Sequence, residues 1–143
     1  MTDLSLRQEL YTAQASVHGG RNGHGRTSDG QLDLDLRSPV EMGGSGGGTN
    51  PEQLFALGYA ACFQSAMEVV GRRLGVDTSS STVTAQVTLG TIGGGAFGLA
   101  VRLEIAIGGV DHETGEQVVK AAHEVCPYSN ATRDNIEVAL VVV

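Results

Sequence analysis

The stretch NPEQLFALGYAACFQSAMEVVGRRLG, residues 50–75, decides the fold of this 143-residue chain. Its ends carry helix signals: Asn50 is a good N-cap, Pro51 suits the first helical position, and Gly75 suits a left-handed C-cap. The helix between them spans roughly 24 residues, or about 36 Å. Residues 54–63 are apolar on nearly every face, and a helix of that kind lies inside a core. We therefore predict a long central helix.

Alternating apolar and polar residues predict strands on both sides of this helix. Before it, segments 11–17 and 31–36 alternate and are separated by a glycine-rich turn that ends in Asp29-Gly30, so we expect a hairpin. After it, segments 82–89 and 97–107 alternate around GTIGGGAFG and predict a second hairpin.

The end of the chain reads as two helices and a strand. Asp111 is a suitable cap for a helix that runs to about Val125, and Pro127 interrupts it because the residue before proline is pushed out of the α region. A short helical segment over 128–133 follows, and 136–143 closes the chain as a strand.

The glycine-rich segment 38–49 is predicted to be a flexible connector. Its GGSGGG run resembles a phosphate-binding loop only in composition, because no G-x-G-x-x-G frame fits and no lysine follows.

Composition bounds the class of protein. Hydrophobic residues make up 41% of the chain and charged residues 17%, so we expect one folded domain over 1–143. The charge of −7, with Lys120 as the only lysine, disfavours nucleic-acid binding, which needs clustered cations. No apolar run has the length of a signal peptide or of a membrane span, roughly 18 residues, so we expect a cytoplasmic protein without a membrane partner.

Cys62 and Cys126 are the only cysteines, 64 positions apart (126 − 62). A free cysteine in so apolar a helix is usually a small hydrophobe. Cys126, however, directly precedes Pro127 at a helix break, where irregular backbone can present a side chain to a partner. Two such thiols in a reducing compartment favour redox chemistry over a structural disulfide.

A nucleophilic Cys62 requires a cation beside it, because a thiol with a pKa of about 8.5 is only a few per cent ionised at neutral pH. Arg21 is the candidate, since the glycines at 19, 20 and 23 let the backbone come close and aim the side chain inward. A solvated loop charge is the ordinary alternative. Glu52 is expected to hold this guanidinium in a bidentate pair, or else only to compensate the helix dipole.

Glu52 cannot touch Cys62 along one straight helix, because ten residues (62 − 52) span about 15 Å. Arg21 must bridge them, the helix must bend, or one residue must come from a second chain. We favour an active site assembled at a subunit interface.

Metal binding is the main alternative from the residues alone. His123 and Cys126 are spaced for one helical face, and Cys62 with one further histidine could complete four ligands. The signal is weak, since there is no C-x-x-C, and we expect no metal. A Ser-His-Asp hydrolase is less favoured still, because no nucleophile elbow occurs.

Three segments together resemble the organic hydroperoxide resistance branch of the OsmC/Ohr family. They are YTAQASVHGGRNG at 11–23, GGTNPEQLFALGYAACF at 47–63 and HEVCPYSNATRDNI at 123–136. The resemblance covers nearly the whole chain, and the combination of two long cysteine-bearing motifs with an early GGR is highly specific. It implies an α/β (α+β) fold and an intertwined homodimer, with antiparallel sheets wrapped around two long central helices.

The resemblance also implies an activity and its residues. Cys62 would be the peroxidatic cysteine of an organic hydroperoxide reductase, Cys126 the resolving cysteine, Arg21 the activating cation and Glu52 its partner. A sulfenic acid and then an intramolecular disulfide would form, recycled by dihydrolipoamide or a lipoylated protein. No bound cofactor is implied. Apolar neighbours in the central helix would form the walls for an alkyl chain, or else simply pack the core: Leu54, Phe55, Phe63 and Met67.

Two other function classes remain open at this point. A redox sensor would use the same disulfide without turnover, and the osmotically induced sister branch would share the chemistry with another physiology. The GGR and NPEQ segments favour the hydroperoxide branch.

Overall fold

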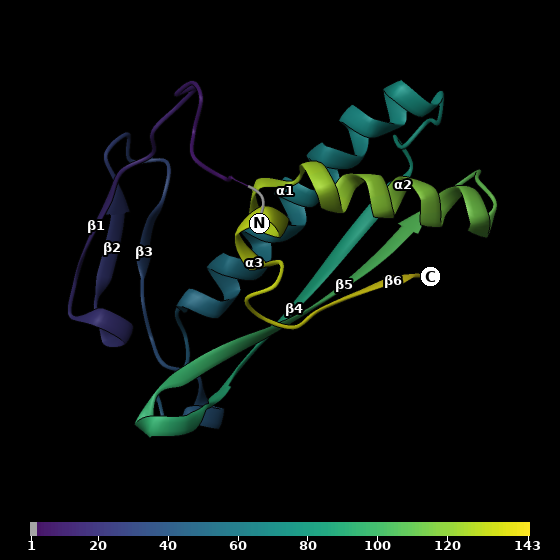
Figure 1. Cartoon of the computed structure of the whole chain (residues 1–143). Coiled ribbons are helices and arrows are strands. Elements are labelled where there is room, and N and C mark those ends of the chain that lie inside the picture. Colours follow the sequence, from purple (N-terminus) through teal and green to yellow (C-terminus); the bar gives the residue numbers. More distant parts are fainter. Residues whose placement is uncertain (1–2) are drawn as a thin grey trace. The chain divides into compact units, whose positions relative to one another are not determined.

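A computed structural model describes residues 3–143, which form a mixed α/β structure with two sheets (Figure 1). The chain divides into two compact units, one that ends at Leu54 and one over Phe55–Val143. Each has its own sheet, so each is described by itself. That both belong to one domain over 1–143 stays a prediction.

The first unit carries a small antiparallel sheet in the order β1-β2-β3. Its strands are β1 (Ala15–His18), β2 (His24–Thr27) and β3 (Asp33–Asp35), and the 3-10 turn η1 (Gly20–Asn22) joins the first two. The expected hairpin of 11–17 with 31–36 is therefore wrong, because β2 lies between β1 and β3 and pairs with both. The HGRT sequence of β2 has no apolar residue that would signal a half-buried strand.

Segment 38–49 is not the open connector expected from its glycines. It contains the 3-10 turn η2 (Val40–Met42), and Ser38 O accepts a hydrogen bond from Gly46 N at 3.0 Å. Glycines with positive φ supply the left-handed backbone that such turns need, as at Gly43 with φ 78°. The loop then returns through a parallel bridge between Leu36 and Thr49.

The long helix α1 spans Pro51–Leu74, as the sequence predicts. Asn50 caps it, accepting a hydrogen bond from Gln53 N at 2.9 Å. By length and composition alone α1 could cross a membrane, but buried core helices pass the same test. Tyr59, Phe63 and Met67 of α1 are fully buried within the protein.

The second unit is built on a sheet in the order β4-β5-β6. The predicted hairpin is present as β4 (Ser81–Thr91) and β5 (Phe97–Ile107), joined through η3 (Gly93–Gly95). The last strand β6 (Val138–Val142) runs parallel to β5, so the expectation of purely antiparallel sheets is wrong (Figure 1). The helical crossover between β5 and β6 accounts for this direction, because parallel neighbours need a long connection.

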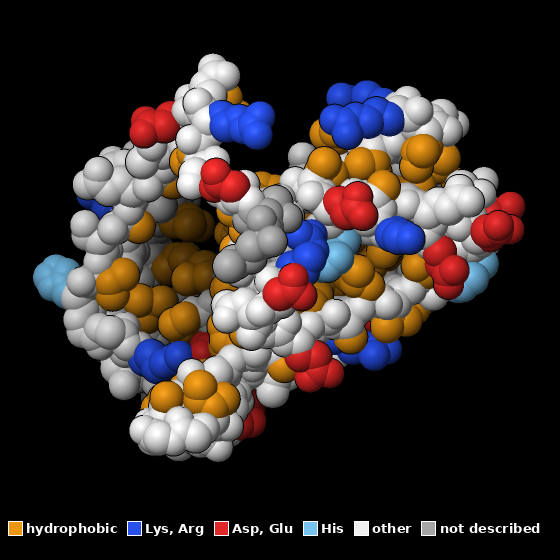
Figure 2. All heavy atoms as spheres, viewed as in Figure 1, with side chains coloured by type: hydrophobic (Ala, Val, Ile, Leu, Met, Phe, Trp, Pro, Cys, Tyr) orange, Lys and Arg blue, Asp and Glu red, His pale blue; other side chains and the backbone are white. Residues whose placement is uncertain are grey.

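Two helices form that crossover. The first, α2 (His112–Val125), begins at Asp111, whose carboxylate accepts a hydrogen bond from Thr114 N at 2.7 Å. The second is α3 (Pro127–Thr132). Acidic, basic and histidine side chains mingle on the outer face of α2 (Figure 2), as expected for the solvated side of an amphipathic helix.

The core of the second unit joins α1, β5 and α2. Its buried members alternate along β5 and recur at helical spacing on α1 and α2: Tyr59, Phe63, Ala66, Met67, Val70, Val101, Leu103, Ile105, Val118, Val119, Ala122 and Cys126. Cys126 is a buried member of this core, so the packing of the unit also fixes the position of its thiol.

A pH-dependent ion cluster on the first sheet gives a prediction. His24 Nδ1 lies 2.9 Å from Asp35 Oδ1, and its Nε2 contacts Asp33. These hydrogen bonds, first from Asp35 and then from Asp33, raise the pKa of His24, while His24 lowers the pKa of Asp35. The His24 contribution to stability is thus present below pH about 6.5 and is lost as pH rises through the folded pKa.

We expect Asp35→Asn to lower the His24 pKa, followed by NMR titration of the imidazole. Asp77→Asn is the matched control, because Asp77 bonds only to the neighbouring Ser79. An unchanged His24 pKa in Asp35→Asn would show that the carboxylate does not hold the imidazolium.

Candidate functional site

The two cysteines meet within the second unit. Cys62 lies half-buried on α1, Cys126 is fully buried between α2 and α3, and both are free thiols. Cys126 Sγ donates to Cys62 Sγ at a distance of 3.6 Å. A disulfide bond is about 2.05 Å long, so a small approach of the sulfurs would join them.

The backbone around Cys126 is fixed on both sides. Its N–H donates to Ala122 O at 2.9 Å and ends α2, while its C=O accepts from Asn130 N at 2.9 Å and begins α3. Pro127 enforces this break, and Cys126 takes the extended conformation with ψ 123°. One residue is thereby the C-cap of one helix and the N-cap of the next, with its sulfur directed at α1.

The surroundings of Cys62 in this unit favour the thiol. Burial is the main cause and raises its pKa; the backbone of Tyr128 lowers it, and the neighbouring Cys126 raises it again. Desolvation disfavours the charged form of a thiol, so a thiolate at neutral pH needs a positive group nearby. The contacts of Cys62 within the second unit do not include one.

The predicted partners Arg21 and Glu52 are joined in the first unit. Arg21 Nη1 donates to Glu52 Oε2 at 2.8 Å and Nη2 to Oε1 at 2.6 Å, which is the bidentate geometry of a guanidinium with a carboxylate. The side chains are 34% and 15% exposed. Hydrogen bonding to Arg21 is the main cause that lowers the pKa of Glu52, so the pair stays ionised at neutral pH.

Two backbone devices bring these residues together. Arg21 sits in η1, where Gly19 has φ 79° and an added Cβ would lie 2.8 Å from Gly23 Cα, so the turn needs glycine. On the other side, Thr49 N donates to Asp35 O at 3.0 Å and ties the start of α1 to the end of β3. Glu52 follows in the first helical turn, where a carboxylate also favours the dipole.

An apolar pocket of about 700 Å³ opens beside α3, in the second unit. Its apolar lining begins one residue after Cys126 and comes from α1, β5, α3 and the segment after it: Phe55, Leu99, Pro127, Tyr128, Ala131 and Ile136. The pocket therefore offers an alkyl-sized volume in the same unit as the sulfurs.

Of the four predicted walls, only Phe55 lines this pocket. Phe63 and Met67 are fully buried in the core, the alternative that their helical spacing also allowed. Leu54 is half-buried at the end of the first unit. Helical periodicity identifies apolar positions but not which of them face a cavity.

Sequence reasoning missed Tyr128 and Tyr59. Their rings lie 5.6 Å apart, and each has its ring centre about 6 Å from that of Phe55, at 5.8 and 6.1 Å respectively. Gly58 allows this packing, because a Cβ there would lie 2.7 Å from Tyr128 Oη. A signal for this aromatic group was available in the sequence. Three of the six tyrosines and phenylalanines lie within four residues of a cysteine: Tyr59, Phe63 and Tyr128.

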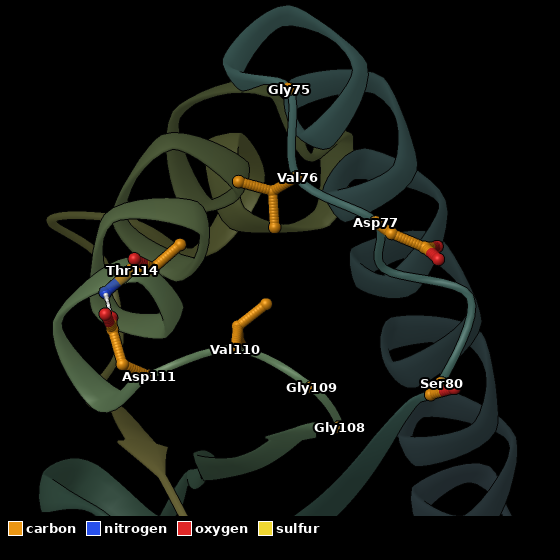
Figure 3. A pocket seen from close by; sticks show the side chains of 9 residues that line it. All are labelled: Gly75, Val76, Asp77, Ser80, Gly108, Gly109, Val110, Asp111 and Thr114. Carbon is orange, nitrogen blue, oxygen red and sulfur yellow. Dashed lines mark hydrogen bonds between the residues drawn. The ribbon is translucent and has the colours of Figure 1, made fainter.

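A second cavity, of about 650 Å³, lies between the loops that follow α1 and β5 (Figure 3). Val76 and Val110 point into it, whereas Asp77 turns away and Asp111 is engaged with Thr114. Neither thiol lines this cavity, and its carboxylates have local structural partners.

The proposed metal ligands do not gather in the structure. Among residues 3–143 no group of three or more His, Cys, Asp or Glu side chains is placed to hold an ion. Burial, the larger cause, and the charge of Arg133 lower the pKa of His123, whose Nδ1 is buried without a hydrogen-bond partner.

Comparison with known proteins places this geometry in context. The chain matches the model of the OsmC-like protein family over residues 44–141. It is 50% identical over 138 residues to an organic hydroperoxide resistance protein of Xanthomonas axonopodis pv. citri, covering 95% of this chain and 96% of that protein. It is 43% identical over 132 residues to the organic hydroperoxide resistance protein OhrB of Bacillus subtilis, covering 92% and 96%.

Solved structures agree with these matches. An organic hydroperoxide resistance protein of Legionella pneumophila superposes with a TM-score of 0.90 at 50% identity, covering 94% of this chain and 98% of that one. A putative organic hydroperoxide resistance protein of Vibrio cholerae, with captopril bound in one of its active sites, gives a TM-score of 0.92 at 47% identity, covering 96% and 95%.

The sulfur geometry predicts an intrachain disulfide. Treatment with the thiol oxidant diamide should join Cys62 to Cys126, because 3.6 Å must shorten by only about 1.5 Å to reach bonding distance. Intact mass spectrometry should show the loss of two hydrogens, and peptide mapping a single cross-linked pair. Cys126→Ser should give no such product. A wild-type product that links two chains at dilute protein would contradict the geometry.

Proposed function

The chain belongs to the OsmC-like protein family, and on that premise we propose that it is a thiol-dependent peroxidase that reduces organic hydroperoxides to alcohols. The observation that carries the proposal is the pair of free sulfurs 3.6 Å apart, one half-buried and one fully buried. The names of the relatives supply the reaction class, and the sulfurs supply a means of performing it.

The first step is nucleophilic attack. The Cys62 thiolate attacks the distal oxygen of ROOH, the O–O bond breaks, and RO⁻ takes up a proton to leave as ROH. Cys62 becomes a sulfenic acid, so the sulfur loses the two electrons that the peroxide gains. A positive group near the leaving oxygen would stabilise the developing alkoxide.

The second step uses the neighbouring thiol. Cys126 sulfur attacks the Cys62 sulfenic sulfur, water leaves, and an intramolecular disulfide forms. The existing hydrogen bond from Cys126 Sγ to Cys62 Sγ supports this order, because the attacking thiol is already in contact with its target. An external dithiol must then reduce the disulfide, and we propose a dihydrolipoyl group on a lipoylated protein of the cytoplasm.

Arg21 is our candidate for the cation that Cys62 needs. Burial raises the Cys62 pKa, and one guanidinium at a partly desolvated site can lower a thiol pKa by one or more, which corresponds to about 1.4 kcal/mol for each factor of ten in ionisation. Glu52 would fix the orientation of Arg21 through their bidentate pair. The Glu52 carboxylate also offsets the charge of the Arg21 guanidinium. The effect of Arg21 on the thiolate would therefore depend mainly on where its guanidinium lies.

We propose a homodimer as the active form. The helix α1 is apolar enough to be a core helix, yet within one chain Leu57 on it is 69% exposed and Val69 is 38% exposed. A second copy would cover this face and could bring its own residues to the thiols.

The pocket beside α3 is our candidate for the alkyl portion of the substrate. Its lining, which includes Phe55, Leu99, Tyr128 and Ile136, offers apolar contact and no charged side chain, so bulky hydroperoxides should react faster than hydrogen peroxide. We propose no metal and no bound cofactor.

Steady-state consumption of cumene hydroperoxide with dihydrolipoamide tests the proposed function. Wild type should turn over many equivalents, and Cys62→Ser should fall to the rate without enzyme because it lacks the nucleophile. Cys126→Ser should still consume about one equivalent. Equal rates for wild type and Cys62→Ser would end the enzyme proposal, and a single turnover by wild type would favour a sensor.

The role of Arg21 has its own test. Arg21→Ala should raise the Cys62 pKa and slow alkylation by iodoacetamide at pH 7, roughly tenfold if the pKa rises by about one, because thiolate is the reactive form. Arg26→Ala, on β2 directly after the turn that carries Arg21 and with its guanidinium near Asp33, is the matched control. Identical Cys62 pKa values in wild type and Arg21→Ala would separate Arg21 from the thiolate.

A further inference from the structure

A buried cluster of three hydroxyls links α1 to α3. Tyr59 Oη lies 2.8 Å from Ser129 Oγ and 3.1 Å from Thr132 Oγ1. Thr132 Oγ1 also donates to Ser129 O at 3.3 Å. Tyr59 and Ser129 are completely buried, and Thr132 is 5% exposed at the edge of the pocket beside α3.

Counting donors assigns the direction of each bond. Each hydroxyl has one proton to donate, and that of Thr132 is used on the Ser129 carbonyl. Tyr59 therefore donates to Thr132 Oγ1, and Ser129 donates to Tyr59 Oη. All three protons are satisfied, which is what a buried polar cluster requires to be compatible with the fold.

The hydroxyl cluster stands one helical turn from the sulfurs. Tyr59 precedes Cys62 by three residues on α1, and Ser129 follows Cys126 by three residues on α3. Residues three apart are neighbours on a helix surface. The Tyr59–Ser129 contact and the Cys62–Cys126 contact are thus two successive contacts between α1 and the segment formed by Cys126 and α3, at 2.8 and 3.6 Å.

The short helix α3 depends on contacts with α1 such as these hydrogen bonds. It has only six residues, and a helix of that length is not stable by itself. Its other contacts with α1 include those of Tyr128, whose backbone hydrogen-bonds to Cys62 and whose ring packs against Phe55 and Tyr59. Hydrogen bonds are directional, so the hydroxyl cluster, together with the Tyr128 backbone bond, sets the rotation of α3 about its axis.

We propose that Tyr59, Ser129 and Thr132 are positioning residues that hold Cys126 Sγ against Cys62 Sγ and so set how readily the two sulfurs join and separate. The inference deepens the proposed function, since it concerns the resolving step of that reaction. It does not require that the oxidant be a hydroperoxide.

Equilibrium with glutathione measures this positioning directly. One oxidised glutathione converts the Cys62–Cys126 dithiol to its disulfide and yields two reduced glutathiones, so the equilibrium constant is the effective concentration of the two thiols. Tyr59→Phe removes one donor and leaves Ser129 and Thr132 partly unpaired. We expect the constant to fall roughly three- to tenfold, the range that one lost hydrogen bond corresponds to.

Thr132 provides a matched pair of variants. Thr132→Val keeps the shape but removes the hydroxyl and should lower the constant as Tyr59→Phe does, whereas Thr132→Ser keeps the hydroxyl and should stay within about twofold of wild type. Val70→Ala, a core truncation on α1 outside the cluster, controls for general loss of stability and should leave the constant near wild type.

The proposal is overturned if Thr132→Val matches Thr132→Ser, or if Val70→Ala lowers the constant as much as Thr132→Val. Should Tyr59→Phe not fold, the two Thr132 variants decide alone. The outcome is separable from that of the proposed function. Wild type that forms the disulfide with glutathione but consumes no hydroperoxide refutes the enzyme while leaving the positioning role measurable.

Discussion

The approach of two sulfurs to 3.6 Å across α1 and α3 is the constraint on which the rest of this structure depends. It needs a helix that is long enough to lie at the centre of the core. It also needs a helix break at Cys126 that directs the cysteine side chain at α1, and hydrogen bonds that hold the short helix α3 after the break. Pro127 supplies the break, and the core places α2 so that the break occurs beside Cys62. The pocket lined by Tyr128 follows from the same packing, because it opens where α3 leaves α1.

Placing a reactive sulfur in a packed interior creates an electrostatic conflict. Burial brings the sulfurs together, but burial also raises the pKa of Cys62 and opposes the thiolate. The first unit contains the complementary element, a guanidinium already oriented by Glu52 and carried on a glycine-rich turn. If Arg21 stabilises the Cys62 thiolate as proposed, the second unit supplies the nucleophile and the first unit supplies the charge that ionises it. The reactivity of Cys62 then depends on how the two units are brought together.

The sequence was most informative where one local signal determines the outcome. The caps at Asn50 and Asp111 located the starts of two helices, and the Arg21–Glu52 ion pair followed from matching donor and acceptor geometry. It failed where tertiary context decides. No apolar alternation marks β2, and the direction of β6 is set by a helical crossover rather than by its own residues. Phe63 and Met67 lie in the core and not at the pocket beside α3, because a helix that is apolar on most sides does not show which of its sides packs into the core.

The unequal burial of the two thiols has a further meaning. A solvent-borne oxidant meets Cys62 first, since Cys126 is sealed beneath the helices and its proton is already shared with its neighbour. The sealed sulfur is thereby protected from stepwise addition of oxygen, which would consume it irreversibly. If the pair reacts as proposed, Cys126 stays an unoxidised thiol until Cys62 has become a sulfenic acid, which is the oxidised state that a second thiol can still convert to a disulfide.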